Sequence, residues 1–250
     1  MRNLIFAANW KMHVTPDEAR AYLKTFLPRV SPRDGRELWF CPPAVSLEAT
    51  AQAVQGRHDT RVGAQNIYWE PKGAFTGETS VGLAAGAGAV GALVGHSERR
   101  HVFGETEGDT QKKVEALLLA GMTPLLCVGE KLAEREAGDT LAVVLRQLGS
   151  ACAPLKPEQL SRIIIAYEPV WAIGTGKNAT PADAAEVHRA IRAELAPRGY
   201  AHPRILYGGS VNEKNIKSLL AEPEIDGVLV GGASLDPEGW ARIVETRSTD

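Results

Sequence analysis

The sequence has few cysteines, few aromatic residues and almost no net charge. Its 250 residues include three cysteines, Cys41, Cys127 and Cys152, which are far apart and form no C-x-x-C pair. An odd, scattered set of cysteines argues against a disulfide framework and favours a reducing cytoplasm. The formal net charge of -2 gives no broad electrostatic reason to expect binding to nucleic acid or to an anionic membrane surface.

Long apolar runs and metal-binding patterns are also lacking. The apolar segment at 4–8, LIFAA, is too short for the hydrophobic region of a signal peptide or for a transmembrane helix. The histidines form no H-x-H or H-E-x-x-H pattern, and no cluster of histidine or cysteine has zinc spacing. We therefore expect a soluble, cytoplasmic protein with no metal centre and no membrane partner.

Short apolar segments recur along the whole chain, and several of them show no alternation with polar residues. Such runs are typical of strands buried on both faces of a parallel sheet. They lie at 4–8, 37–41, 61–64, 91–95, 123–128, 163–167, 204–209 and 227–232. Helix-like segments lie between them, at 15–27, 109–121, 180–196, 212–221 and 236–245, and the last two begin with Asn212 and Asp236 as N-caps.

Eight strand-like segments, each followed by a helix-like or turn-rich segment, match the size of an eight-fold β/α barrel. No linker or change in composition indicates a second domain. The sequence therefore predicts an α/β protein, a single-domain (β/α)8 barrel over residues 1–250. A doubly wound open sheet is the alternative, because local patterns do not show whether a sheet closes.

Two glycine-rich segments look like nucleotide-binding motifs but lack the required context. GAGAVG at 86–91 satisfies G-x-G-x-x-G, yet it follows a helix-like segment and precedes a strand, which reverses the order that a dinucleotide site needs. IGTGKN at 173–178 lacks the first glycine and the final Ser or Thr of a phosphate-binding loop. We expect no nicotinamide, flavin or nucleotide cofactor.

Polar residues gather where the predicted strands end. Asn9 and Lys11 follow the first strand, His96 and Glu98 follow the fourth, and Glu168 follows the sixth. In a β/α barrel these ends meet at one opening, where polar side chains are typical of catalysis. A carboxylate at the end of a buried strand costs several kcal/mol unless it is used or paired.

Glycine turns follow the seventh and eighth predicted strands, GGSVN at 208–212 and GGASL at 231–235. Loops at these two positions commonly bind phosphate in barrels of this kind. Glycine allows backbone N–H groups to approach an oxyanion, and a following helix N-terminus adds positive potential. We expect Lys11 to be the one buried cation near them.

Each of these residues also has an ordinary structural explanation. Lys11 fits a surface charge, His96 fits a core histidine with satisfied hydrogen bonds, and Glu98 fits an ion pair with Arg99 or Arg100. Glu168 is the hardest to explain in this way, because Pro169 follows it and it has no helical partner. The occurrence of all of them at one rim is stronger evidence for an active site than any single residue.

Motifs in family order over nearly the whole chain resemble those of the triosephosphate isomerases. They are NWKM (9–12), GAQN (63–66), GAFTGE (73–78), GHSERR (95–100), AYEPVWAIGTGK (166–177), YGGSV (207–211) and GVLVGGASL (227–235). The resemblance implies a TIM barrel and a glycolytic and gluconeogenic enzyme. It would interconvert dihydroxyacetone phosphate and glyceraldehyde 3-phosphate through an enediolate, by proton transfer and without a cofactor.

The resemblance also implies a role for each matching residue. Glu168 would be the base, and His96 a neutral electrophile that polarises the substrate oxygens. Lys11 and Asn9 would supply a positive charge and a hydrogen bond. Ser97, Glu98 and Cys127 would support these groups, segment 169–179 would be a lid, and the phosphate would be held by the backbone amides of Gly174, Ser210, Gly231 and Gly232.

The segment 73–78 is glycine-bounded and too long for a tight turn. By resemblance it inserts into a second copy of the chain, with Thr76 near Asn9 and Lys11 of that copy. We therefore expect a homodimer, and the sequence does not exclude a tetramer. The chain departs from common family residues at His13, after NWKM, and at Asn178, in the C-terminal hinge of the lid, which leaves the opening rate of the lid open.

Two other classes of function remain as alternatives. One is a different phosphate-handling barrel enzyme, such as an aldolase or a pentose-phosphate epimerase. An aldolase needs a Schiff-base lysine or a zinc cluster, and an acid two residues beyond His96 would pair with Lys11 instead. The other is a catalytically silent binding protein with the same fold, which normally follows the loss of a rim residue.

Overall fold

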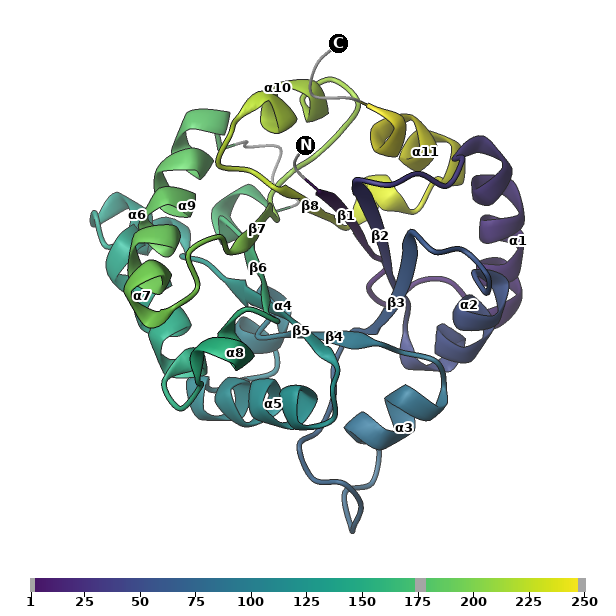
Figure 1. Cartoon of the computed structure of the whole chain (residues 1–250), viewed down its shortest axis with the longest axis horizontal. Helices are drawn as coiled ribbons and strands as arrows, with labels where there is room; N and C mark the ends of the chain where they lie inside the picture. The colour runs from purple at the N-terminus through teal and green to yellow at the C-terminus, as the bar shows by residue number, and fades with distance from the viewer. Residues whose placement is uncertain (1–2, 174–178, 247–250) are drawn as a thin grey trace.

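The computed structural model describes residues 3–173 and 179–246 and contains a closed ring of eight parallel strands enclosed by helices (Figure 1). Each strand pairs with its neighbours in chain order, and β1 pairs with β8 to close the ring. The strands are β1 (Leu4–Asn9), β2 (Arg36–Cys41), β3 (Thr60–Ala64), β4 (Gly91–Val94), β5 (Thr123–Val128), β6 (Ile164–Tyr167), β7 (Arg204–Tyr207) and β8 (Gly227–Val230). The predicted (β/α)8 barrel is confirmed, and the open-sheet alternative is wrong.

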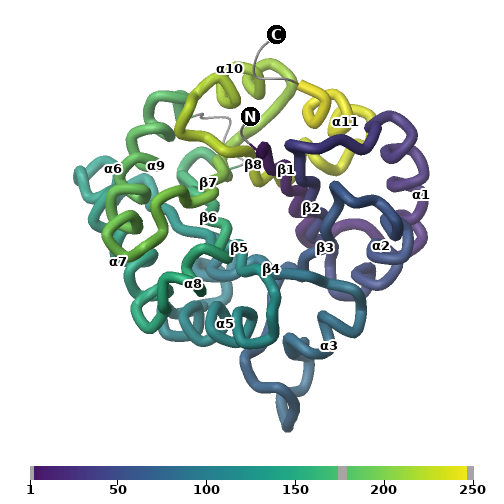
Figure 2. Tube along the Cα trace, viewed as in Figure 1, coloured from purple at the N-terminus to yellow at the C-terminus, as the bar shows by residue number. Residues whose placement is uncertain are grey.

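Helices follow the strands and form the outer layer, which the tube in Figure 2 shows as a ring of coils around the sheet. They are α1 (Pro16–Phe26), α2 (Leu47–Ala53), α3 (Val81–Gly86), α4 (Ser97–His101), α5 (Glu107–Leu119), α6 (Leu132–Glu136), α7 (Thr140–Cys152), α8 (Pro157–Leu160), α9 (Pro181–Leu195), α10 (Ile216–Ala221) and α11 (Pro237–Glu245). Two of the helices, α1 and α9, each begin with a Thr-Pro pair. Thr15 and Thr180 form capping boxes with Glu18 and Asp183.

One predicted helix begins later than the sequence indicated. α10 starts at Ile216, and Asn212 is not its N-cap. The side-chain oxygen of Asn212 instead accepts the N–H groups of Lys214 and Asn215, at 2.9 and 3.3 Å. This local turn satisfies the same oxygen that a helix cap would use, so it competes with helix formation.

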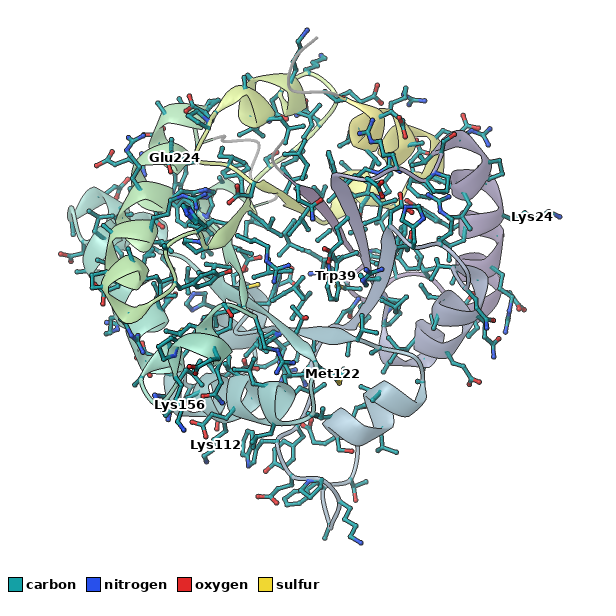
Figure 3. The ribbon with its side chains drawn as sticks, viewed as in Figure 1. Lys24, Trp39, Lys112, Met122, Lys156 and Glu224 are labelled. Carbon is teal, nitrogen blue, oxygen red and sulfur yellow. The ribbon has the colours of Figure 1, made fainter. Side chains whose placement is uncertain are left out.

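The core has two layers because successive residues of a strand point to opposite faces of the sheet. Ile5 and Ala7 of β1 lie inside the barrel, whereas Phe6 and Ala8 pack against the outer helices. Figure 3 shows Trp39 inside the ring and Lys24 extending outward from α1. Burial on both faces explains why the strands read as apolar runs without alternation.

The G-x-G-x-x-G segment has the reversed context expected from the sequence. Residues 86–91 lie between the end of α3 and the start of β4, so no strand precedes the segment and no helix opens on it. In the described part of the chain, no helix is both long and apolar enough to cross a bilayer.

Candidate active site

A cavity of about 230 Å³ lies at the carboxyl end of the barrel. Asn9, Lys11, His96 and Glu168 line it, together with residues of the glycine turns after β7 and β8. The sequence-predicted rim residues therefore surround one space, although they come from distant parts of the chain. The volume is below the range of about 300–1,000 Å³ typical of drug-sized ligands, so it suits a small metabolite.

Glu168 follows β6 directly and is only 2% exposed. Its Oε2 accepts the backbone N–H of Ser97 at 2.9 Å, and its Oε1 lies 3.0 Å from Nε2 of His96. Burial alone would raise the pKa of the Glu168 carboxyl, but His96 and the Ser97 N–H favour the charged form and lower the pKa below its usual value. The buried carboxylate therefore favours its charged form.

His96 is the N-cap of α4, which places its ring between a helix N-terminus and Glu168. Its Nδ1 accepts the backbone N–H of Glu98 at 3.3 Å. Burial lowers the pKa of His96, but the carboxylates of Glu168 and Glu98 together outweigh it and raise the pKa above its usual value. A proton on Nδ1 would nevertheless face the N–H of Glu98, so the contacts fit a neutral ring with its proton on Nε2.

Lys11 has a left-handed backbone, with φ of 49°, and its ammonium lies 2.6 Å from Oε1 of Glu98. Its backbone N–H donates to Oδ1 of Asn9 at 3.0 Å, so the two residues are held as one unit. The expectation that Lys11 is the one buried cation is wrong. Its side chain is 27% exposed, whereas Arg36 and Lys113 are almost fully buried elsewhere.

Trp10 anchors the segment that carries Asn9 and Lys11. Its ring is fully buried and lies edge-on to Tyr22 of α1, with ring centroids 4.8 Å apart. The hydroxyl of Tyr22 in turn donates to the carbonyl of Ser234, in the turn after β8, at 2.7 Å. This packing ties the end of β1 to the glycine turn after the neighbouring strand β8.

Two glycines of these turns lie against charged side chains of the site, which explains why no larger residue occupies their positions. A Cβ on Gly208 would lie 2.7 Å from Cγ of Glu168, and one on Gly231 would lie 2.9 Å from Cε of Lys11. A side chain at either position would displace the charged residue. The other two predicted phosphate ligands in these turns, Ser210 and Gly232, also line the cavity, whereas Gly174 lies outside the described residues.

The three predicted supporting residues have different surroundings. Ser97 contacts Glu168, and Glu98 contacts both His96 and Lys11. Cys127 is buried inside the barrel on β5, where burial raises the pKa of its thiol. Of the two departures from common family residues, His13 is exposed and Asn178 lies outside the described residues.

The sequence analysis missed Glu130, which follows β5 closely and is fully buried. Its Oε1 accepts the indole N–H of Trp171 at 2.8 Å and the hydroxyl of Tyr167 at 3.1 Å. Burial raises the pKa of Glu130. An acid just after a buried strand is the same signal that identified Glu168, so this residue could have been found.

A parallel β/α barrel with a buried carboxylate, an imidazole and a lysine at its carboxyl end is typical of an enzyme acting on a small anionic metabolite. Comparison with known proteins specifies the family. The family model described as triosephosphate isomerase matches residues 4–247.

Curated relatives with the name triosephosphate isomerase agree with this match. The protein of Aquifex aeolicus is 50% identical over 247 residues, which cover 98% of this chain and 99% of the relative. That of Solibacter usitatus is 49% identical over 248 residues, with coverage of 98% and 99%. The chain belongs to the triosephosphate isomerase family.

Proposed function

We propose that this chain interconverts dihydroxyacetone phosphate and glyceraldehyde 3-phosphate by moving a proton between adjacent carbons. Family membership supports the reaction. The observation that carries the assignment of roles is the gathering of Asn9, Lys11, His96 and Glu168 around one small cavity bordered by glycine turns.

Glu168 is the base, and its contacts explain how substrate activates it. In the free enzyme Oε1 lies against Nε2 of His96, and this contact lowers the pKa of the carboxyl. A substrate carbonyl that accepts the Nε2 proton displaces Oε1 from the ring. The carboxylate then loses a stabilising partner in a dry site, so its pKa rises and it becomes a stronger base.

The removal of a carbon-bound proton puts negative charge on an enediolate oxygen. Lys11, Asn9 and His96 are donors already in place before the charge develops. Preorganised electrostatic stabilisation of this kind is usually the largest contribution to catalysis. Proton transfer by a positioned base adds a further factor of roughly 10²–10⁴.

The phosphate of the substrate binds at the glycine turns after β7 and β8. The backbone amides of Ser210, Gly231 and Gly232 are its ligands, and Gly174 completes the set in the lid. Backbone donors suit this purpose because glycine allows close approach. They also explain how a chain with a net charge of -2 holds a dianion.

The lid excludes water and retains the enediolate, which would otherwise lose its phosphate by elimination. Its first part is anchored through Trp171 to Glu130, and Ile173 lines the cavity. The residues 174–178 of the lid lie outside the described part of the chain.

A coupled assay on triose phosphate, with EDTA and without nucleotide, tests the function against its two alternatives. Turnover under these conditions supports the isomerase. Adduct formation after borohydride treatment with substrate would indicate an aldolase Schiff base at Lys11. Absence of turnover in a folded protein would indicate a silent binding protein and would refute the proposal.

We also propose that two copies assemble through segment 73–78, which protrudes from the barrel between β3 and α3 (Figure 1). Thr76 at its tip is exposed, and Phe75 beside it is 40% exposed. A second cavity of about 220 Å³, on the Glu98 side of Lys11 and lined also by Phe103, has room for the Thr76 of a partner copy. Sedimentation of a monomer at micromolar concentration would contradict this assembly.

The proposal also places the enzyme in the cytoplasm, as one domain formed by the whole chain. The free, buried state of Cys41, Cys127 and Cys152 supports a reducing compartment. Secretion of the native protein, or a stable proteolytic fragment that is shorter than the barrel, would contradict these two points.

A further inference from the structure

Gln65 lies in the GAQN segment at 63–66, for which the proposed reaction supplies no role. It follows β3, and its side chain reaches across the ends of the two preceding strands. Its Nε2 donates to the carbonyl of Lys11 and to the carbonyl of Cys41, each at 2.8 Å. A carboxamide nitrogen carries two hydrogens, so both carbonyls are satisfied by one side chain.

The carbonyl of Lys11 belongs to a residue with an unfavourable backbone. A φ of 49° is uncommon for a residue with a side chain, and such strain persists only where the surroundings enforce it. Here the N–H of Lys11 is held by Asn9, and its carbonyl is held by Gln65. In this conformation the side chain of Lys11 crosses Gly231 and reaches Glu98.

We propose that Gln65 is a positioning residue for the reaction, and that it fixes Lys11 in the left-handed conformation that directs the ammonium to the cavity. The proposal rests on the isomerase function given above. Without the clamp, Lys11 relaxes toward the right-handed region, and its charge leaves the place where the enediolate forms. Gln65 itself does not touch substrate.

Two substitutions separate this role from simple packing. Gln65→Leu keeps the size of the side chain and removes both donors, and we expect kcat/KM to fall roughly tenfold, since small displacements of a catalytic group are costly. Gln65→Glu sets a carboxylate against two carbonyls, so the loss is greater near neutral pH. It is partly reversed as pH is lowered, because the protonated acid regains one donor. Gln52→Leu, on an exposed face of α2, is the matched control and leaves kcat/KM unchanged.

A double-mutant cycle with Lys11→Met decides whether Gln65 acts through the lysine. We expect Gln65→Leu to have almost no further effect once the ammonium is absent. An equal loss of kcat/KM with and without Lys11 would mean that Gln65 acts through folding or assembly, and would overturn the proposal. Full activity of Lys11→Met alone would instead refute the role of Lys11 in the proposed function. Sedimentation of each variant at the assay concentration shows whether assembly has changed.

Discussion

Two buried carboxylates, Asp59 near the amino end of the barrel and Glu168 at its carboxyl end, have different partners. At the amino end, Asp59 is fully buried and contacts Arg36 at 2.6 Å and Arg57 at 3.1 Å, and Arg36 also contacts Glu245. At the carboxyl end, Glu168 has one imidazole and one backbone N–H. Lys11 pairs with Glu98, whose side chain is 45% exposed.

The difference separates charges that stabilise the fold from charges that remain available for chemistry. Burial raises the pKa of Asp59, but its two arginines lower it to a value below the usual range, and the aspartate side chain is 0% exposed. Glu168 contacts one imidazole and one backbone N–H rather than two guanidinium groups. We therefore propose that, of these two buried carboxylates, only Glu168 exchanges a partner for a substrate oxygen and reacts.

The largest expected effect is the loss of turnover when Glu168, the carboxylate at the carboxyl end, is changed. Glu168→Asp retracts the carboxylate by one methylene, and we expect kcat to fall by a factor of about 10²–10⁴, with a smaller change in substrate affinity. The free energy of unfolding should change by less than about 1 kcal/mol, because the carboxylate remains in the site. Near-parental turnover of this variant would remove Glu168 from the role of base.

At the amino end of the barrel we expect a large loss of stability with no change in kcat. Asp59→Ala leaves Arg36 and Arg57 without their shared partner, and should lower the free energy of unfolding by about 3–5 kcal/mol in denaturant titrations. The kcat of the folded variant should match that of the parent.

The matched control is Asp17→Ala, which removes an ion pair with Arg20 in which the aspartate is 97% exposed. We expect it to cost less than about 0.5 kcal/mol. A similar small loss for Asp59→Ala would show that the amino-end network is not a stabilising feature.

A third buried group, His188 of α9, has a pKa that is set mainly by burial. Its Nδ1 lies 2.9 Å from the carbonyl of Glu224, and burial lowers the pKa of His188 to about 4. The unfolded chain binds this proton at about pH 6.5, so folded stability is full above that pH and declines as pH falls toward 4. The expected loss is about 2 kcal/mol by about pH 5.

The variant that tests this is His188→Gln, because its amide can still meet the Glu224 carbonyl but does not titrate. Its unfolding free energy should be less sensitive to pH between about 6.5 and 5 than that of the parent. The control is His202→Gln at an exposed position. An unchanged pH slope for His188→Gln would refute the assignment.

Much of the barrel was predictable because strands that are buried on both faces appear in the sequence as short apolar segments. Apolar runs identify β1 to β8, and Thr-Pro pairs identify the starts of α1 and α9. The start of α10 was not predictable in this way, since Asn212 serves a local turn as well as it could serve a helix. Nor was the burial of Arg36, whose partner Glu245 is 209 positions away.

Part of the candidate site was predictable from one rule: polar residues at the carboxyl ends of barrel strands meet at one opening. That rule, together with the motifs, brought Asn9, Lys11, His96 and Glu168 to one cavity. The rule does not describe backbone conformation, so the left-handed Lys11 and its contact with Gln65 were missed. The roles of these residues stay proposals until they are measured.

The most direct test of proton transfer follows the hydrogen on the reacting carbon. Isomerisation of dihydroxyacetone phosphate by the parent chain in heavy water, stopped early, gives glyceraldehyde 3-phosphate whose deuterium at the carbon beside the aldehyde can be measured by mass spectrometry. Proton transfer through Glu168 predicts deuterium at that carbon, because a carboxyl proton exchanges with solvent. Product free of deuterium would show that the transferred hydrogen never exchanges with solvent, and would contradict the exchange through the Glu168 carboxyl that the account predicts.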